Sequence, residues 1–115
     1  MKALIVDDSQ FMRATIKQAI SDLAEDISEA GDMDSALNNF REKKPDIVFL
    51  DIMMQESDTG VYILQEMKNI DESAKIVVVS SLEFDNTLVK RAFKMGIDGF
   101  VQKPFKAEQI RKFMQ

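Results

Sequence analysis

The sequence predicts an α/β protein built on a doubly wound sheet of five parallel strands with five flanking helices. Short apolar runs rich in β-branched residues alternate along the chain with segments whose apolar residues recur at helical spacing. Two of these runs, at residues 47–50 and 76–79, are apolar throughout, which is typical of strands buried on both faces of a parallel sheet. Because crossovers between parallel strands are right-handed, the expected strand order is 2-1-3-4-5, with its switch point between the first and third strands.

The first expected strand, at residues 2–6, stops at two acidic residues, Asp7 and Asp8. Ser9 follows, and serine is a favoured N-cap because its hydroxyl accepts a hydrogen bond from the first turn of a helix. The helix expected next carries its apolar residues at helical spacing, which indicates one buried face. These residues are Met12, Ile16, Ala19, Ile20 and Leu23.

A weaker strand is expected at residues 27–30, where Gly31 stops it. A second helix follows and ends before Pro45, because the residue that precedes a proline disfavours helical geometry. This helix is predicted from apolar residues at positions i, i+3, i+4 and i+7, namely Met33, Ala36, Leu37 and Phe40. The central strand at residues 47–50 then ends on a carboxylate, Asp51.

The second half of the chain repeats the pattern. Residues 55–60 are polar and predict a loop, and the strand at residues 76–79 ends on Ser80. Between them a third helix is expected from the helical spacing of its apolar residues, which are Val61, Leu64, Met67 and Ile70. It should end at residues 71–73.

A fourth helix, with Leu88, Ala92 and Met95 on its apolar face, should end at Gly96, because glycine is favoured at helix C-termini. A short fifth strand at residues 99–101 precedes Lys103 and Pro104. The last, short helix is expected to start near Lys106 and to carry Ala107, Ile110 and Phe113 on its apolar face.

The composition is that of a folded, acidic domain. The chain has 115 residues, which is enough for one hydrophobic core, and we expect residues 1–115 to form one domain. It has no cysteine and no histidine, which excludes thiol and serine–histidine catalysis and argues against zinc. The net charge of −5 argues against binding nucleic acid through this domain. With no segment apolar enough to span a membrane, we expect a cytoplasmic protein without a membrane partner.

In the expected topology five polar side chains meet at the carboxyl ends of the strands, at one end of the sheet. Asp7 and Asp8 follow the first strand, Asp51 the third, Ser80 the fourth and Lys103 the fifth. Each alone has an ordinary explanation, as a turn aspartate, a helix cap or a solvated lysine. Carboxylates held close together repel one another, and a divalent cation relieves that repulsion. Oxygen ligands suit Mg²⁺, and a carboxylate beside a metal ion, a lysine and a hydroxyl suggests phosphoryl transfer through an acyl phosphate.

Four motifs, in this order and spacing, resemble the receiver domains of two-component response regulators. They are Val6-Asp7-Asp8-Ser9, Phe49-Leu50-Asp51-Ile52-Met53-Met54, Val79-Ser80-Ser81 and Gly99-Phe100-Val101-Gln102-Lys103-Pro104-Phe105. Each motif alone is weak, whereas the set is specific. The resemblance extends over the whole chain and implies a flavodoxin-like fold. The length is similar to that of single-domain regulators of the chemotaxis type, which have no output domain.

The resemblance implies a signalling switch that catalyses only its own phosphorylation and dephosphorylation. Asp51 would accept a phosphoryl group from the phosphohistidine of a histidine kinase or phosphotransfer protein. Asp7, Asp8 and Asp51 would hold Mg²⁺, together with the backbone carbonyl of Met53. Lys103 would pair with the phosphoryl group.

The resemblance also implies how the signal leaves the site. Ser80 would be the switch hydroxyl, Phe100 the aromatic switch residue, and the Lys103–Pro104 peptide bond would be cis. We further predict that the output protein binds the face made by the fourth helix, the fifth strand and the last helix, because Ser80 begins the loop that leads to the fourth helix. That face carries basic residues on an otherwise acidic protein, which predicts an acidic amphipathic partner. They are Lys90, Arg91, Lys94 and Lys106.

Three positions depart from the family pattern. Most members have proline where Gln55 stands, and the loop that runs to Gly60 is one residue longer than usual. Phe100 lacks the hydroxyl that many chemotaxis regulators have at that position. Leu82 is bulkier than the residue often found there, and it is a candidate shield for the acyl phosphate.

Two other functions stay open on the residues alone. One is a phosphohydrolase with an aspartate nucleophile, although such enzymes place the nucleophile after the first strand in an Asp-x-Asp pattern. The other is a receiver-like interaction module that is never phosphorylated. A flavin site is weaker still, because the chain lacks a phosphate-cradling loop.

Overall fold

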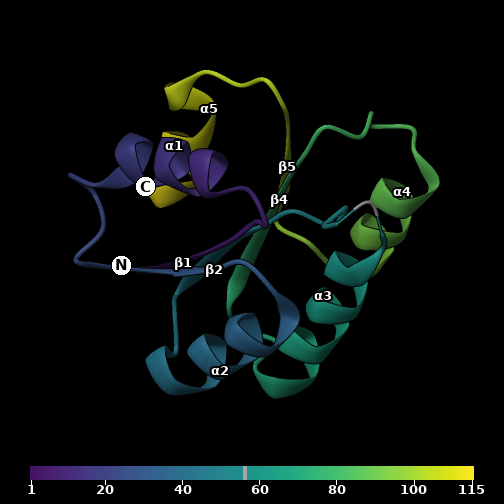
Figure 1. The fold of residues 1–115 in the computed structure, drawn as a ribbon, viewed down its shortest axis with the longest axis horizontal. Helices are drawn as coiled ribbons and strands as arrows, with labels where there is room; N and C mark the ends of the chain where they lie inside the picture. Colours follow the sequence, from purple (N-terminus) through teal and green to yellow (C-terminus); the bar gives the residue numbers. More distant parts are fainter. Residues whose placement is uncertain (56) are drawn as a thin grey trace.

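The computed structural model of the protein describes residues 1–55 and 57–115, and it has the predicted α/β architecture (Figure 1). All four strand pairings are parallel, and the sheet order β2-β1-β3-β4-β5 confirms the prediction. The strands are β1 (Lys2–Val6), β2 (Asp26–Ala30), β3 (Ile47–Leu50), β4 (Lys75–Ser80) and β5 (Gly99–Gln102).

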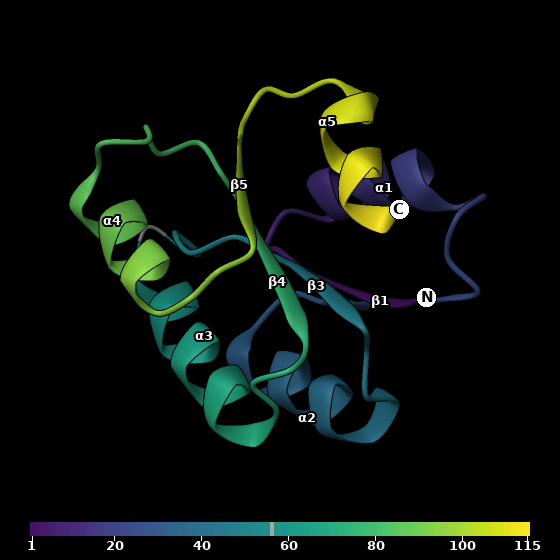
Figure 2. The same ribbon diagram turned by 180° about the vertical axis from the view of Figure 1, so that it is seen from behind.

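Helices cover both faces of the sheet. They are α1 (Gln10–Ile20), α2 (Met33–Lys43), α3 (Thr59–Ile70), α4 (Thr87–Lys94) and α5 (Ala107–Arg111), and a 3₁₀ turn at Lys112–Met114 follows. Two opposite views show α1 and α5 together on one side of the sheet, and α2 and α3 on the other (Figures 1 and 2). Buried residues of α4 pack into the same core as those of α2 and α3. None of the helices in the described part of the chain is long and apolar enough to cross a membrane.

The central strands are buried on both faces, as their continuous apolar sequence predicts. In β3, Val48 and Leu50 belong to the core under α2, α3 and α4, whereas Ile47 and Phe49 belong to the core under α1 and α5. All four are 0% exposed. Because successive side chains of a strand point to opposite faces of the sheet, these four residues contribute to both hydrophobic cores.

Local signals in the sequence set several helix ends. The hydroxyl of Ser9 accepts a hydrogen bond from the Met12 backbone N–H at 3.2 Å, as expected of an N-cap. Asp32 and Asn86 cap α2 and α4 in the same way. Gly96 follows α4 with φ +90°, a left-handed conformation that glycine adopts at little cost.

The bounds predicted from the sequence differ from the structure at the start of α3. Residues 55–60 do not form a loop down to Gly60, because α3 already begins at Thr59; residue 56 lies outside the described residues. Met33, Ile70 and Ala107, whose spacing helped to predict their helices, are exposed. Each is the first or last residue of its helix.

Gly60 explains why α3 can begin so close to β3. A Cβ atom on Gly60 would lie 2.2 Å from the Cα of Ile52 and 2.3 Å from the carbonyl oxygen of Asp51. Real Cβ atoms do not approach backbone atoms this closely, so only glycine fits here. The first turn of α3 therefore packs directly against the backbone that carries Asp51.

Candidate functional site

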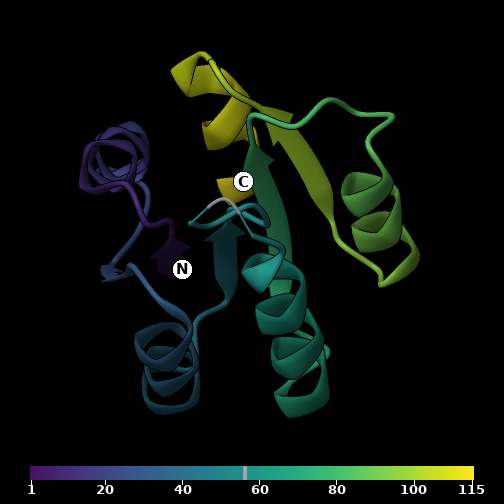
Figure 3. The same ribbon diagram turned by 45° about the vertical axis from the view of Figure 1, so that its right-hand side comes forward.

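The strands point toward one edge of the sheet, where the loops that follow β1, β3, β4 and β5 come together (Figure 3). Asp7 and Asp51 are the first residues after β1 and β3, which pair with Val6 opposite Leu50. The Asp51 backbone N–H donates to the Val6 carbonyl at 3.0 Å, so the pairing continues through the first site residue. This places two carboxylates side by side at the topological switch point, where open α/β sheets bind ligands.

Three carboxylates converge at this edge. One oxygen from each of Asp7, Asp8 and Asp51 lies within 4.8 Å of the others. Asp7 is 1% exposed and Asp51 is 6% exposed, whereas Asp8 is open to solvent. Like charges this close together, two of them buried, need a compensating cation.

Lys103, which follows the edge strand β5, supplies a positive charge to this group. Its Nζ lies 2.8 Å from Asp7 Oδ2 and 3.0 Å from Asp51 Oδ2, and its side chain is 16% exposed. The Lys103 backbone N–H donates to the Ser80 carbonyl at 2.9 Å, which ties the residue to the end of β4. The peptide bond from Lys103 to Pro104 is cis, as the family resemblance implied.

Burial and charge act in opposite directions on this group. Burial disfavours the charged form of Lys103, but hydrogen bonds and charges from Asp7 and Asp51 outweigh it, so the pKa of Lys103 lies above its ordinary value. Burial raises the pKa of Asp7, although hydrogen bonds from Lys103 and the Ser9 backbone lower it. The site therefore holds a charged lysine beside a carboxylate whose ionisation costs free energy.

Replacing Asp7 with asparagine is expected to stabilise the metal-free protein at neutral pH, because the raised pKa of Asp7 means that burial of its charge costs more free energy than its contacts with Lys103 and Ser9 return. The folded state holds the Asp7 proton more tightly than the unfolded state does. The stability linked to that proton is present below the ordinary pKa of 3.8 and is lost as pH rises through the raised pKa of the folded protein. The advantage of the variant should therefore grow with pH through that window and then stay constant.

Urea unfolding of both proteins, followed by circular dichroism at a series of pH values, measures this difference. The alternative result is an Asp7→Asn variant that is no more stable than the wild type at neutral pH. It would mean that ionised Asp7 costs the fold nothing.

Backbone N–H groups orient the other carboxylate oxygens. Asp51 Oδ1 accepts from the Met53 N–H at 2.9 Å, and Asp7 Oδ1 accepts from the Ser9 N–H at 2.9 Å. Asp8 Oδ2 accepts from the Gln55 N–H at 2.8 Å. Each carboxylate is thus held by one main-chain donor before any ligand binds.

The set of donors fits Mg²⁺. The ion prefers oxygen ligands and binds through a few carboxylates while keeping several waters. Asp7, Asp8 and Asp51 offer such oxygens, and Asp8 opens the group to solvent. A bound ion would compensate charge that Lys103 alone does not balance.

Ser80 and Phe100 occupy different surroundings. Ser80 ends β4, is fully buried, and its Oγ accepts from the Leu82 N–H at 3.3 Å. Phe100 lies on β5 in a cluster of three aromatic rings, 6.3 Å from Phe84 and 6.4 Å from Phe93 between ring centroids. The predicted switch residues are therefore a buried hydroxyl at the site edge and an aromatic ring packed under α4.

Three further groups contribute to the site that were not predicted from the sequence. Arg13 Nη1 donates to the Asp7 carbonyl at 2.7 Å, the Gln55 N–H binds Asp8, and Gly60 admits α3 to the end of β3. A glycine at the start of a helical pattern often has a packing reason, so close packing at Gly60 could have been predicted from the sequence. The contact between Gln55 and Asp8 joins residues 47 apart in sequence, and the contact between Arg13 and the Asp7 carbonyl spans six residues; neither matches a helix or strand pattern.

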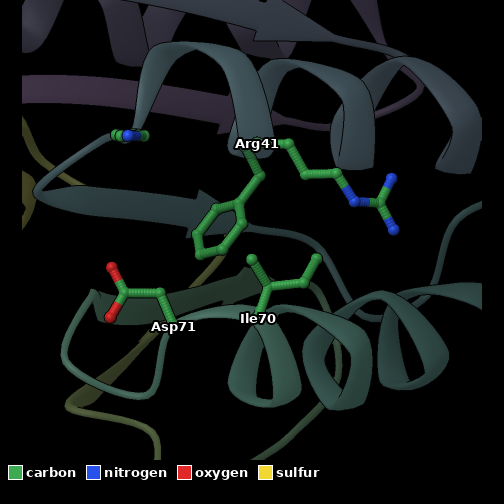
Figure 4. A pocket seen from close by; sticks show the side chains of 5 residues that line it. Arg41, Ile70 and Asp71 are labelled. Atoms are coloured by element: carbon green, nitrogen blue, oxygen red, sulfur yellow. The ribbon is translucent and has the colours of Figure 1, made fainter.

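A cavity of about 280 Å³ lies between the C-terminal ends of α2 and α3, at the other end of the sheet from the carboxylates. It is lined by Phe40, Arg41, Lys44, Ile70 and Asp71. The side chains of Arg41 and Asp71 point to opposite sides of Ile70 (Figure 4). Arg41 lies in the last turn of α2 and Lys44 is its C-cap, where positive charge stabilises the helix dipole. Helix-end stability accounts for these charges, and the cavity lies away from the carboxylates.

A parallel sheet in the order 2-1-3-4-5, with an aspartate cluster and a lysine at the carboxyl ends of its strands, defines a receiver domain. The chain belongs to the response regulator receiver domain family, whose sequence model matches residues 3–115.

The chain is similar to chemotaxis proteins and to a receiver domain of solved structure. It is 38% identical to the chemotaxis protein CheY of Listeria monocytogenes over 100% of this chain and 96% of that protein. It is 36% identical to CheY of Bacillus subtilis, over 95% of this chain and 90% of the relative. The receiver domain of NtrX from Brucella abortus superposes with a TM-score of 0.88 at 31% identity, covering 97% of this chain and 93% of that one.

These findings confirm the family resemblance and the fold class. They also favour a CheY-like signalling domain over the phosphohydrolase that the residues alone left open.

Proposed function

We propose that this receiver domain is switched by phosphorylation of Asp51. A histidine kinase or phosphotransfer protein would donate the phosphoryl group, with Mg²⁺ held by Asp7, Asp8, Asp51 and the Met53 carbonyl. One observation carries the proposal: Asp51 is a buried carboxylate that ends the central strand and shares the Lys103 ammonium with Asp7. Nucleophile and charge stabilisation are thus assembled in one place.

The side chains divide the chemistry between them. An Asp51 carboxylate oxygen attacks phosphorus, the bond from phosphorus to the imidazole nitrogen of the donor breaks, and an acyl phosphate forms. Lys103 already donates to Asp51 and can move its contact to a phosphoryl oxygen while it keeps Asp7. The Met53 N–H holds Asp51 Oδ1 throughout. Mg²⁺, when bound, offsets the negative charge of the phosphoryl oxygens.

Incubation with acetyl phosphate and Mg²⁺ tests the proposal. Intact-mass spectrometry should find one added phosphoryl group on the wild type and none on Asp51→Asn. Asp71→Asn is the matched control, because that carboxylate is exposed at the opposite edge of the molecule and should leave the modification intact. Phosphorylation of the Asp51→Asn protein would mean that another residue is the phosphoryl acceptor. Turnover of a small phosphate ester would reinstate the phosphohydrolase.

The face formed by α4, β5 and α5 is proposed to bind the output protein. Phe84 and Phe93 are 65% and 39% exposed, and their ring centroids are 5.3 Å apart. Together with Phe100 they make an aromatic cluster that we call the phenylalanine cluster. Exposed basic residues lie on α4, the helix that carries Phe93, and at the N-cap of α5, on a protein of net charge −5. They are Lys90, Arg91, Lys94 and Lys106. An acidic amphipathic segment complements both features.

A short path joins Ser80 to this face. The Ser80 hydroxyl accepts from the Leu82 N–H, and Phe84 lies two residues further along the same loop. If the hydroxyl turns to a phosphoryl oxygen, the loop loses that contact and Phe84 shifts against Phe93 and Phe100. Turning Phe100 inward would bury ring area worth roughly 1.5–3 kcal/mol, enough to bias a two-state element.

An NMR comparison of the free and beryllofluoride-bound protein checks this path. We expect shift changes at the phenylalanine cluster and along α4. Ile70 is the internal control, because it is the last residue of α3 and lines the cavity that lies away from the carboxylates. Changes confined to the surroundings of Asp51, with the cluster silent, would contradict the prediction.

A further inference from the structure

The backbone of Gln55 makes a contact that the rest of the site does not explain. Its N–H donates to Asp8 Oδ2 at 2.8 Å, across 47 residues of sequence. Lys103 binds the other two carboxylates, Asp7 and Asp51, so Asp8 takes its hydrogen bond from the β3–α3 loop. Asp8 is also the exposed member of the three, where a side chain is freest to move.

The loop holds Gln55 in an uncommon conformation to make this contact. Gln55 has φ +54°, in the left-handed region that residues other than glycine rarely adopt. Its side chain is exposed, so burial of the glutamine does not account for the strain. The preceding residue is anchored: Met54 is 1% exposed, and its carbonyl accepts from the Ser57 N–H at 3.0 Å and the Ser57 hydroxyl at 2.9 Å. Strained backbone of this kind persists where the surrounding structure fixes it.

We propose that the main-chain N–H of Gln55 is a positioning group for Asp8 and thereby sets the affinity of the site for Mg²⁺. This inference rests on the proposed metal site. A carboxylate has about four acceptor positions, so Asp8 can accept the Gln55 bond and still ligate an ion. Hydrogen-bond partners of metal ligands fix the orientation of the ligand, and their loss weakens metal binding. The group that matters is the peptide N–H, whatever side chain residue 55 carries.

Calorimetric titration of the full chain with MgCl₂ tests the proposal. Gln55→Pro removes the N–H and cannot adopt φ +54°, and it should raise the Kd for Mg²⁺ about tenfold. Gln55→Gly and Gln55→Ala keep the donor, and both should bind within about twofold of the wild type because the backbone contact survives. A purely structural role of the glutamine side chain would predict the reverse for the alanine variant.

A second measurement avoids proline altogether. In the metal-free wild type, solvent exchange of the Gln55 amide should be slowed, and Asp8→Ala should accelerate it about tenfold or more as the hydrogen bond is lost. The same amide should shift on titration with MgCl₂ at the Kd found by calorimetry. An exchange rate unchanged by Asp8→Ala would overturn the inference, whether or not the proline variant folds.

The outcomes separate this inference from the proposed function. Wild-type affinity in Gln55→Pro, together with weakened binding in Asp8→Ala, would end the role of Gln55 and leave the metal site standing. Unchanged binding in Asp8→Ala would overturn both the metal assignment and the inference. Neither result bears on whether Asp51 is phosphorylated, which the mass measurement decides.

Discussion

Alanine at position 60 is expected to lower the free energy of unfolding by about 3 kcal/mol, the upper part of the range for overpacking a tight site. The added Cβ would meet the Ile52 Cα at 2.2 Å and the Asp51 carbonyl oxygen at 2.3 Å. Both are backbone atoms, so no rotamer change relieves the contact. The first turn of α3 has to move away from the end of β3, or the strand end has to move with Asp51.

Urea unfolding followed by circular dichroism measures this loss, since the chain has no tryptophan to report by fluorescence. Gly31→Ala is the matched control, because its Cβ would first meet Arg13 Nη1 at 3.0 Å, the end of a flexible side chain. The control should change stability by less than about 1 kcal/mol. Equal effects at the two glycines would mean that close packing at Gly60 is not what holds α3 in place. We also expect Gly60→Ala to accept phosphoryl groups more slowly, as the displaced backbone carries Asp51.

Replacing Lys103 with methionine is expected to destabilise the metal-free protein by about 2–3 kcal/mol at neutral pH. The side chains of Asp7 and Asp51 are 2% and 8% exposed, and the variant leaves both without their cation. Breaking a fully buried ion pair costs about 3–5 kcal/mol, and the partial exposure of Lys103 reduces that figure. Added Mg²⁺ should recover part of the loss, because the ion compensates the same carboxylates.

The pH dependence of the Lys103→Met variant follows from the raised pKa of Lys103. The stability that the charged lysine contributes is fully present below its ordinary pKa of 10.5 and is lost as pH rises through the higher pKa of the folded protein. The difference between variant and wild type should therefore persist through neutral and mildly alkaline pH.

Two further variants test whether the effect of Lys103→Met comes from the buried carboxylates. Lys90→Met, at an exposed position of α4, should change little. Adding Asp7→Asn to Lys103→Met should restore stability, since it removes one of the uncompensated charges. A double variant as unstable as Lys103→Met alone would argue against this electrostatic account.

Much of the fold could be predicted because it depends on local pattern. The runs at Ile47–Leu50 and Ile76–Val79 are apolar at every position, so their burial on both faces followed from composition alone. Ser9 is a cap by its own chemistry. Crossover handedness then limits how such strands can be ordered, and this brought polar residues at distant strand ends to one edge.

Local pattern was less informative at helix ends. Met33 and Ile70 fit the apolar stripes of their helices but are both 39% exposed. Periodicity reports which face of a helix is apolar, and it does not report where the sheet beneath the helix stops. The cluster of Phe84, Phe93 and the half-buried Phe100 could not be predicted from periodicity either, because its members come from a loop, a helix and a strand.

By itself the sequence determined the class of fold, the strand order and the residues at the strand ends, because hydrophobic period and strand-end chemistry are properties of short segments. Only the tertiary structure decided how those residues meet: that one ammonium group serves both Asp7 and Asp51, that Gln55 turns its N–H to Asp8, and that Gly60 lets α3 reach the end of β3. These are contacts between segments far apart in the chain. Their distances are set by how the loops after β1, β3 and β5 and the first turn of α3 pack together at the carboxyl ends of the strands, and no local pattern carries that information.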